Sequence, residues 1–235
     1  YATNRVKAAY SHINFIGEVY DKNPYRNYVA SGFDYLYDKV GMYDTLRGVM
    51  CGYEGAQAIT SQWKATEDIQ DHMLYFLENH DELRVASDYF AGNAKCGIPA
   101  LIVSALMQKN PFMLYAGEEF GEKGMDSEGF SGVDGRTTIF DYWCVDTLRR
   151  GYFSRKELTK EEKNLEKMHG QILNIAATER AVTDGEFYDL MYANPVSDSF
   201  DAVHLYAFIR KHEDKTLLVI ANFSDTPQVA SVCIP

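Results

Sequence analysis

Cysteine is scarce in this sequence of 235 residues, and the few that occur are scattered. No two of them stand at the spacing of a zinc site or a redox motif; they are Cys51, Cys96, Cys144 and Cys233. Sparse, scattered cysteine is typical of a reducing compartment, so we expect a cytoplasmic protein. Disulfide pairing stays open, because spacing alone does not exclude it.

Long apolar runs and an excess of basic charge are also missing. The longest apolar candidate, "IPALIVSALM" at 98–107, is too short to span a bilayer and suits a buried helix. The formal net charge is −11 at pH 7. Because nucleic acids and anionic membranes attract basic surfaces, this charge argues against both as partners.

Aromatic side chains, in contrast, are plentiful, with 17 Tyr, 13 Phe and 2 Trp. Such rings stack on flat apolar faces, including those of sugars, but they also fill ordinary protein cores. With 46% hydrophobic residues, the chain can bury one large core or two smaller ones.

Strand-like and helix-like segments alternate as far as about residue 180. Each expected strand is apolar on both faces, which is typical of a parallel sheet covered by helices. Repeated strand-then-helix order favours right-handed βαβ crossovers. The expected strands are 13–19, 33–37, 72–79 and 111–117; the expected helices are 5–14, 39–51, 84–109 with interruptions, and 159–178, which a Thr159–Glu162 capping box begins.

The pattern changes near residue 183. The segment "VHLYAFIR" (203–210) alternates, with Val203 and Leu205 on the same face, and "TLLVIANF" (216–223) follows across a polar turn. This is the composition of an antiparallel hairpin. We therefore expect an α/β domain over residues 1–180 and a small all-β domain over 181–235.

Carboxylates follow two of the expected strands directly. "FIGEVYD" (15–21) places Glu18 after an apolar run, and "FLENHDELR" (76–84) does the same for Asp81. A charge at such a position is costly unless it is paired or reaches solvent. The carboxyl ends of parallel strands are also where functional sites assemble, so both carboxylates are candidate site residues.

Three elements in this order resemble signature regions of the α-amylase superfamily, glycoside hydrolase family 13. They are "FIGEVYD", "FLENHD" and "PFMLYAGEEFG" (111–121), and "GRTTIFDYW" (135–143) with a β-rich tail is similar to the same family. The resemblance covers most of the chain. It implies that the visible strands are the fifth to eighth of a (β/α)8 TIM barrel, whose C-terminal half precedes a truncated β domain.

The resemblance also implies a role for each site residue. Glu18 would be the general acid/base, and Asp81 the carboxylate that stabilises the transition state. His80 and Asn79 would bind substrate, His80 through a sugar hydroxyl in the cleavage subsite. Tyr20 stands where family members often carry an aromatic residue near the substrate. No metal or cofactor is implied, and the substrate would be an α-1,4-linked glucan such as starch or maltodextrin.

The chemistry of retention explains these residue types. An acid must protonate the leaving oxygen while a second carboxylate attacks the sugar, at about 5–5.5 Å from the acid. In the family this nucleophile is an aspartate on the fourth strand, within an Arg-x-Asp element that is absent before Glu18. We therefore expect a fragment that is inactive alone. A homodimer or a companion chain would cover its open sheet edge.

Other functions compete with hydrolysis. Transglycosylases of the same superfamily share these motifs, and some members keep the barrel only as a binding module. A metal-dependent hydrolase built on His80, Asp81 and Glu82 is a further alternative. Consecutive side chains point in opposite directions, which argues against one shared ion.

Nearby charges have simpler interpretations. We expect Arg84 to pair with Glu82 on a solvated helix start, and the many carboxylates of 117–135 to form a solvated face. Calcium there is an alternative, although the spacing fits no EF-hand loop. The aromatic cluster of 34–44, which includes Met42 and Tyr43, is interpreted as core.

Overall fold

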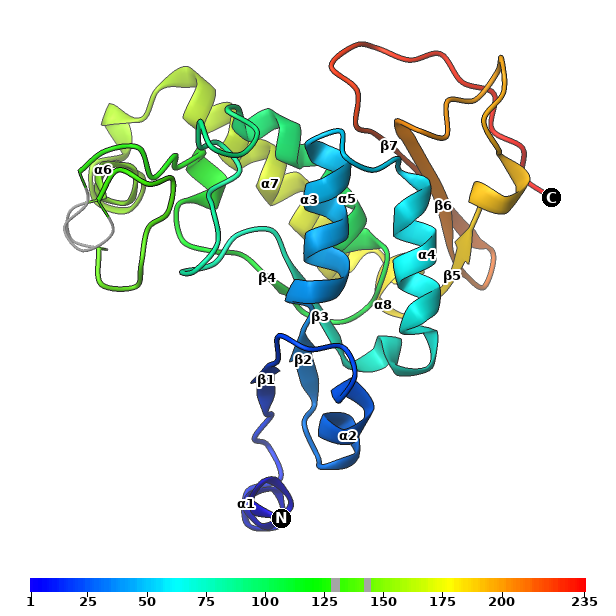
Figure 1. Ribbon diagram of the computed structural model, residues 1–235, viewed down its shortest axis with the longest axis horizontal. Coiled ribbons are helices and arrows are strands. Elements are labelled where there is room, and N and C mark those ends of the chain that lie inside the picture. The colour runs from blue at the N-terminus through cyan, green and yellow to red at the C-terminus, as the bar shows by residue number, and fades with distance from the viewer. Residues whose placement is uncertain (128–131, 142–144) are drawn as a thin grey trace.

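The computed structural model describes residues 1–127, 132–141 and 145–235 (Figure 1). Cys144, the end of "GRTTIFDYW" and part of the 117–135 loop lie outside the described residues. In chain order the helices and strands are α1 (Ala2–Ala9), β1 (Ile16–Glu18), α2 (Tyr25–Ala30), β2 (Tyr35–Tyr37), α3 (Asp44–Met50), α4 (Gln57–Ala65), β3 (Met73–Phe76), α5 (Ile98–Leu106), β4 (Phe112–Met113), α6 (Asp146–Leu148), α7 (Lys160–Thr178), α8 (Arg180–Thr183), β5 (Glu186–Asp189), β6 (Leu205–His212) and β7 (Lys215–Asn222).

The first sheet has the order β1-β2-β3-β4, and every neighbouring pair is parallel. This confirms the predicted parallel neighbours, although each strand is shorter than the apolar run that marked it. Gly17 pairs with Leu36, and Leu36 with Met73, so one register continues across the first three strands. Within the described residues, β1 and β4 are the open edges of this sheet.

The helices that cover the sheet agree only in part with prediction. Helix α7 begins at the predicted capping box, where the Thr159 hydroxyl accepts the Glu162 N–H at 3.1 Å. The segment 39–51 is helical as predicted, with a π-helical turn before α3. Helix α4 was not predicted.

The predicted helix over 84–109 is wrong in its first half. Only α5 and a short 3-10 turn at Ala94–Gly97 are helical there. Arg84 enters the interior instead of starting a solvated helix, and Gly92 takes a φ of 66°, in the left-handed region that interrupts a helix. The segment 84–93 is therefore a series of turns.

The helix predicted over 5–14 is confirmed only in part, since α1 spans Ala2–Ala9, and it buries none of its residues. In Figure 1 it lies beyond β1, near α2, and the Thr3 hydroxyl donates to the Ser31 carbonyl at the end of α2. No helix in the described part of the chain has both the length and the apolar character that crossing a bilayer requires.

The second sheet is antiparallel, in the order β5-β6-β7. Strands β6 and β7 form the predicted hairpin, and Glu213 turns it with a φ of 53°. Strand β5 was not predicted. The expected one-sided alternation is wrong, because six successive residues of β6 from Leu205 to Arg210 are buried. As the central strand of this sheet, β6 is covered on both faces.

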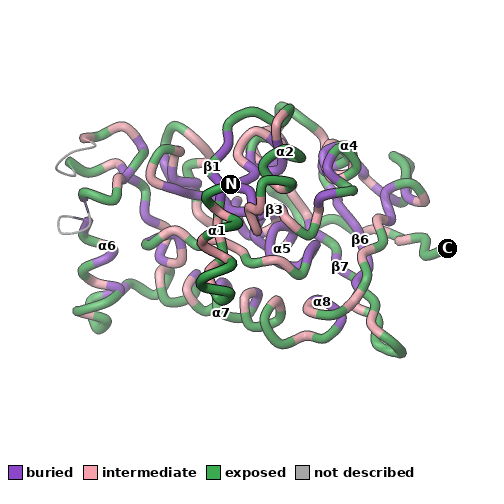
Figure 2. The backbone as a smooth tube through the Cα atoms, turned by 90° about the horizontal axis from the view of Figure 1, so that it is seen from below, coloured by how far each residue is buried: buried purple, intermediate pink, exposed green. Residues whose placement is uncertain are grey.

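One hydrophobic core joins both sheets. It runs from Leu36 and Met73 in the parallel sheet, through Leu101 of α5, to Phe208 and Val219 in the antiparallel sheet. Figure 2 shows the buried stretches gathered in the middle of the molecule around β3 and α5. The division into domains 1–180 and 181–235 thus stays a prediction, since the packing is continuous.

The aromatic cluster of 34–44 is core, as predicted. Tyr43 stacks on Phe76 with ring centroids 5.0 Å apart, and Tyr37 meets Phe76 edge-on at 4.5 Å. Met42 is also buried. These rings lie directly beneath the carboxyl ends of β2 and β3, so they support the loops that follow those strands.

Candidate active site

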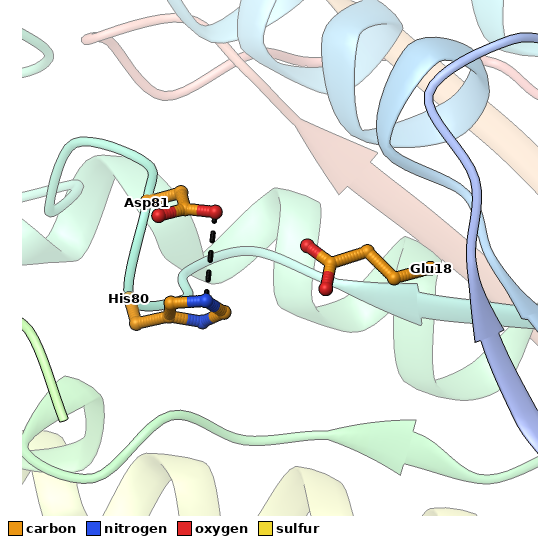
Figure 3. A group of neighbouring side chains, drawn as sticks. All are labelled: Glu18, His80 and Asp81. Atoms are coloured by element: carbon orange, nitrogen blue, oxygen red, sulfur yellow. Dashed lines mark ion pairs between the residues drawn. The ribbon is translucent and has the colours of Figure 1, made fainter.

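The ends of two strands bring the predicted carboxylates together at the carboxyl-terminal side of the parallel sheet. Glu18 is the last residue of β1, and Asp81 lies in the loop that follows β3. Both strands are parallel to β2 between them, so their carboxyl ends point the same way. In Figure 3 the Glu18 carboxylate points toward His80 and Asp81.

Glu18, His80 and Asp81 form a close group. One side-chain oxygen or nitrogen atom of each lies within 4.8 Å of those of the other two. The His80 Nε2 atom is 3.5 Å from Asp81 Oδ2, an ion pair when the ring is protonated (Figure 3). Glu18 and Asp81 are exposed and His80 is half-buried, so the group is open to a ligand from solution.

Tyr20 joins the two carboxylates. Its hydroxyl donates to Glu18 Oε1 at 2.6 Å and lies 3.4 Å from Asp81 Oδ2. Burial and then the hydrogen bond to Glu18 raise the pKa of the Tyr20 hydroxyl. Tyr20 therefore keeps its proton and acts as a hydrogen-bond donor within the group.

Asn79 supports this group from below. It is buried, and its Oδ1 accepts the backbone N–H groups of Asp81 at 2.8 Å and Glu82 at 2.7 Å. This turn geometry is a common use of asparagine, whose side chain bonds its own backbone two residues on. The amide thus orients Asp81 from inside the loop.

The expected pairing of Arg84 with Glu82 is wrong. Arg84 is 1% exposed, and its Nη1 donates to Glu78 Oε2 at 2.7 Å. Glu82 turns the other way, to Lys39 at 3.3 Å and to the Tyr43 hydroxyl at 3.2 Å. Glu78 is buried together with Arg84, whereas Glu82 is only half-buried.

The orientation of Glu82 also removes the metal site considered on His80, Asp81 and Glu82. Within the described residues, the group close enough to share an ion is Glu18, His80 and Asp81. There the hydroxyl of Tyr20 contacts one oxygen of each carboxylate. The expectation of a site without metal stays a prediction.

Glu78 is a residue that the sequence analysis missed. It is 2% exposed, and besides Arg84 it accepts the Val85 N–H at 2.7 Å through Oε1. The available signal was a carboxylate inside an otherwise apolar run, "LYFLEN" at 74–79, without a break before it. Such a carboxylate requires a buried partner.

The carboxylates of 117–135 are not all solvated, contrary to expectation. Glu118 and Glu122 are 4% and 5% exposed. Burial, reinforced by the charge of Glu78, raises the pKa of the Glu118 carboxyl well above its usual range. His169 of α7 lies 3.9 Å from Glu118 Oε1, and burial lowers the pKa of its ring. For both side chains burial therefore favours the neutral form.

Comparison with known proteins places this geometry in a known fold. A maltogenic alpha-amylase from Thermotoga neapolitana has 16% identity and a TM-score of 0.61, over 94% of this chain and 44% of its own. AmyP, solved with maltose, has 17% identity and a TM-score of 0.64, over 90% and 45%. CldA, a cyclomaltodextrin glucanotransferase, has 16% identity and a TM-score of 0.58, over 94% and 40%.

These similarities show the α-amylase fold, as the three sequence elements predicted. The chain spans less than half the length of each of these structures. The part that it shares contains the parallel sheet and the antiparallel sheet together. No protein-family model matches the sequence, and no curated protein matches it.

Proposed function

We propose that this chain belongs to an α-amylase-type glycoside hydrolase that cleaves α-1,4-glucosidic bonds with retention. In this proposal β1 to β4 are the fifth to eighth strands of the (β/α)8 barrel. The observation that supports it is the proximity of Glu18, His80 and Asp81 at the carboxyl ends of the parallel strands, although they come from the ends of two different strands. A glucan is supported by the maltose bound to AmyP, which has this fold.

Glu18 acts first as the general acid. It gives its proton to the glycosidic oxygen as the bond to the anomeric carbon breaks, and the sugar gains positive charge. Asp81, which is exposed at the same rim, stabilises this charge and binds ring hydroxyls. His80 donates to a sugar hydroxyl beside it.

Retention needs a nucleophile opposite Glu18. Among the described residues at this rim, both carboxylates already have other roles, so the nucleophile comes from a neighbouring strand outside this sequence. After the covalent intermediate forms, Glu18 as a carboxylate takes a proton from water as its oxygen attacks the anomeric carbon, and the ester bond to the nucleophile breaks, which releases the nucleophile as a carboxylate.

Transglycosylation is the second candidate. A sugar hydroxyl would replace water in the last step, with Glu18 again as the base. The fold shared with a cyclomaltodextrin glucanotransferase favours keeping this candidate. Product analysis separates the two, because a transferase makes longer or cyclic glucans and a hydrolase makes reducing ends.

The acid assignment is tested in the full-length protein. Glu18→Gln should lower hydrolysis of maltooligosaccharides by about 10²–10⁴-fold, because general acid catalysis contributes typically that much. A glycosyl fluoride needs little protonation and should lose less in the first step. Asp81→Asn should slow both substrates, since it removes charge stabilisation and not a proton.

The control is Asp71→Asn, an exposed carboxylate that pairs only with Lys109. It should leave both rates unchanged. Equal losses for Glu18→Gln on the two substrates would disprove the acid role. Rates near those of the parent would favour a barrel that only binds glucan.

The isolated chain provides a separate test. Without a nucleophile it should release no reducing sugar from starch, and release by the pure chain would refute this part. Its open β1 edge should associate with a second copy or a companion chain, because unpaired strand edges template pairing. Light scattering that shows only a monomer would count against that association.

A further inference from the structure

Arg84 lies where three segments meet behind the candidate site. Its Nη1 donates to Glu78 Oε2 at 2.7 Å. Its Nη2 donates to the Ala116 carbonyl at 2.8 Å, just after β4. Its Nε donates to the Thr137 hydroxyl at 3.0 Å. One side chain therefore joins the loop after β3, the loop after β4 and the segment near residue 137.

The loop that carries His80 and Asp81 is closed at its base by the same pair. Glu78 begins the loop and accepts both the Arg84 guanidinium and the Val85 N–H, at 2.7 Å each. The Arg84 N–H in turn donates to the Gly135 carbonyl at 2.8 Å. The loop is thus fixed at both ends by groups that are buried.

The guanidinium also packs over an aromatic ring. Its central carbon lies 4.2 Å from the centroid of Tyr115, whose hydroxyl donates to the Thr137 carbonyl at 2.8 Å. The planar, forked shape of arginine allows bidentate and stacking contacts at once, which a lysine ammonium does not provide. Lysine at this position would keep a positive charge beside Glu78 and lose the reach to Ala116 and Thr137.

A second buried arginine shows that burial alone does not explain this arrangement. Arg210 is 3% exposed, and its guanidinium donates to carbonyls of Met107, Ala181, Val182 and Gly185. Among the described residues no carboxylate pairs with it, and it lies in β6 of the antiparallel sheet. A buried ion pair is weak evidence for stability in itself, so the Glu78–Arg84 pair calls for another reason.

We propose that Arg84, paired with Glu78, is a positioning residue that holds Asp81 and His80 at the height where they face Glu18. This rests on the proposed function, and it assigns to Arg84 no contact with substrate. Misplacement of a catalytic group by about 1 Å can cost about 10²-fold in rate. Loosening the loop should therefore reduce kcat far more than it changes KM.

The first test is kinetic, in the full-length protein. Arg84→Lys should lower kcat by about 10- to 100-fold with KM within about threefold, on maltooligosaccharide and glycosyl fluoride alike. In the Asp81→Asn background it should add less than about a threefold loss, because residues that act as one unit are not additive. Arg210→Lys is the matched control, which should keep kcat.

The second test needs no activity and uses the 235-residue chain. Amide hydrogen exchange at Asp81 and Glu82, whose N–H groups bond to Asn79, should become at least about tenfold faster in Arg84→Lys than in Arg210→Lys. Urea unfolding measures the global stability of both variants, and their exchange rates are compared under conditions in which these stabilities are equal.

The outcomes separate this inference from the proposed function. Unchanged exchange at these amides in Arg84→Lys, or fully additive kinetics with Asp81→Asn, would overturn the positioning role. A full-length protein without glycosidase activity would overturn the function instead. Faster exchange would still establish that Arg84 holds the loop.

Discussion

The carboxyl ends of the parallel strands and the antiparallel sheet bury different chemistry. Behind the parallel sheet, Glu78, Arg84, Glu118 and His169 are all buried within one neighbourhood. In the antiparallel sheet the central strand buries mostly apolar side chains, and its single buried cation, Arg210, is satisfied by carbonyl oxygens. Both regions belong to one continuous hydrophobic core.

This difference shows where the fold contains groups whose burial costs free energy. Buried charged and polar groups reduce stability unless partners satisfy them by pairing and hydrogen bonds. Apolar packing stabilises the fold without such a condition. The costly groups gather beneath the loop that carries His80 and Asp81. In the antiparallel sheet, in contrast, the buried side chains of the central strand are mostly apolar ones that stabilise the fold by packing.

The largest expected effects on the unfolding free energy come from truncating one buried side chain to alanine in each region. Glu78→Ala leaves Arg84 charged and buried, which should cost about 3–5 kcal/mol in unfolding free energy. Phe208→Ala, at a fully buried ring, should cost about 3–5 kcal/mol through the cavity. Urea unfolding measures both.

The two losses should then respond differently to an apolar repair. The double variant Glu78→Leu/Arg84→Met removes both charges and should lose much less than Glu78→Ala, because no unpaired charge remains. If the double variant is as unstable as the single one, the Arg84 contacts to Ala116 and Thr137 dominate, and the distinction between the regions fails.

The next effect is a dependence on pH. The pKa of Glu118 is higher in the folded than in the unfolded chain, where it is near the ordinary 4.5. Its stabilising contribution is therefore complete below pH 4.5 and is lost as pH rises through the folded pKa. Relative to the parent, Glu118→Gln should gain up to about 1.4 kcal/mol per pH unit between pH 4.5 and the folded pKa, and the gain should level off above the folded pKa.

Chemical unfolding at a series of pH values measures this gain. Exposed Glu67 provides the control, since Glu67→Gln should show no such trend. His169 acts in the opposite direction, because its depressed pKa lets the unfolded chain bind a proton first. Its contribution should weaken as pH falls below about 6.5. A flat difference between Glu118→Gln and the parent would contradict the buried neutral acid.

A smaller effect compares two buried tyrosines. The Tyr206 hydroxyl donates to the Asp189 carboxylate at 2.8 Å, and the Tyr75 hydroxyl to the amide oxygen of Gln70 at 3.0 Å. Hydrogen bonds to charged groups contribute about 1.5–3 kcal/mol and neutral ones about 0.5–1.5. Tyr206→Phe should therefore lose more stability than Tyr75→Phe. The reverse order in thermal unfolding would show that the hydrogen bond to Asp189 contributes no more stability than the one to the neutral amide.

The smallest effect on stability should come from the site itself. Tyr20 is 49% exposed, so Tyr20→Phe should change the unfolding free energy by less than about 0.5 kcal/mol. In the full-length protein it should still slow hydrolysis by about tenfold, through loss of the bond to Glu18. An unchanged rate would show that Tyr20 only lines the entrance.

Local patterns in the sequence predicted much of the fold. Apolar runs marked the parallel strands, the Thr159–Glu162 pair marked the start of α7, and the alternation after residue 203 marked the hairpin. The sequence missed α2, α4 and β5, and it extended one helix over 84–93. In that segment helix-forming residues are outweighed by the burial of Arg84 and by the φ of Gly92.

What the sequence determined by itself was where carboxylates follow the apolar strand segments. Glu18 and Asp81 directly follow apolar strands, and parallel pairing then places them at the same edge. Neither their spacing nor their type depends on the rest of the fold. The resemblance to α-amylases therefore predicted the shared fold correctly from three short elements.

Only the tertiary structure decided how these residues are supported. Two carboxylates closely precede Arg84 in sequence, Glu78 and Glu82, and burial selected the first. Glu118 meets His169 from a distant helix, which no local pattern encodes. The physical reason is that the cost of a charge depends on its exposure, and exposure is a property of all the segments that pack around it.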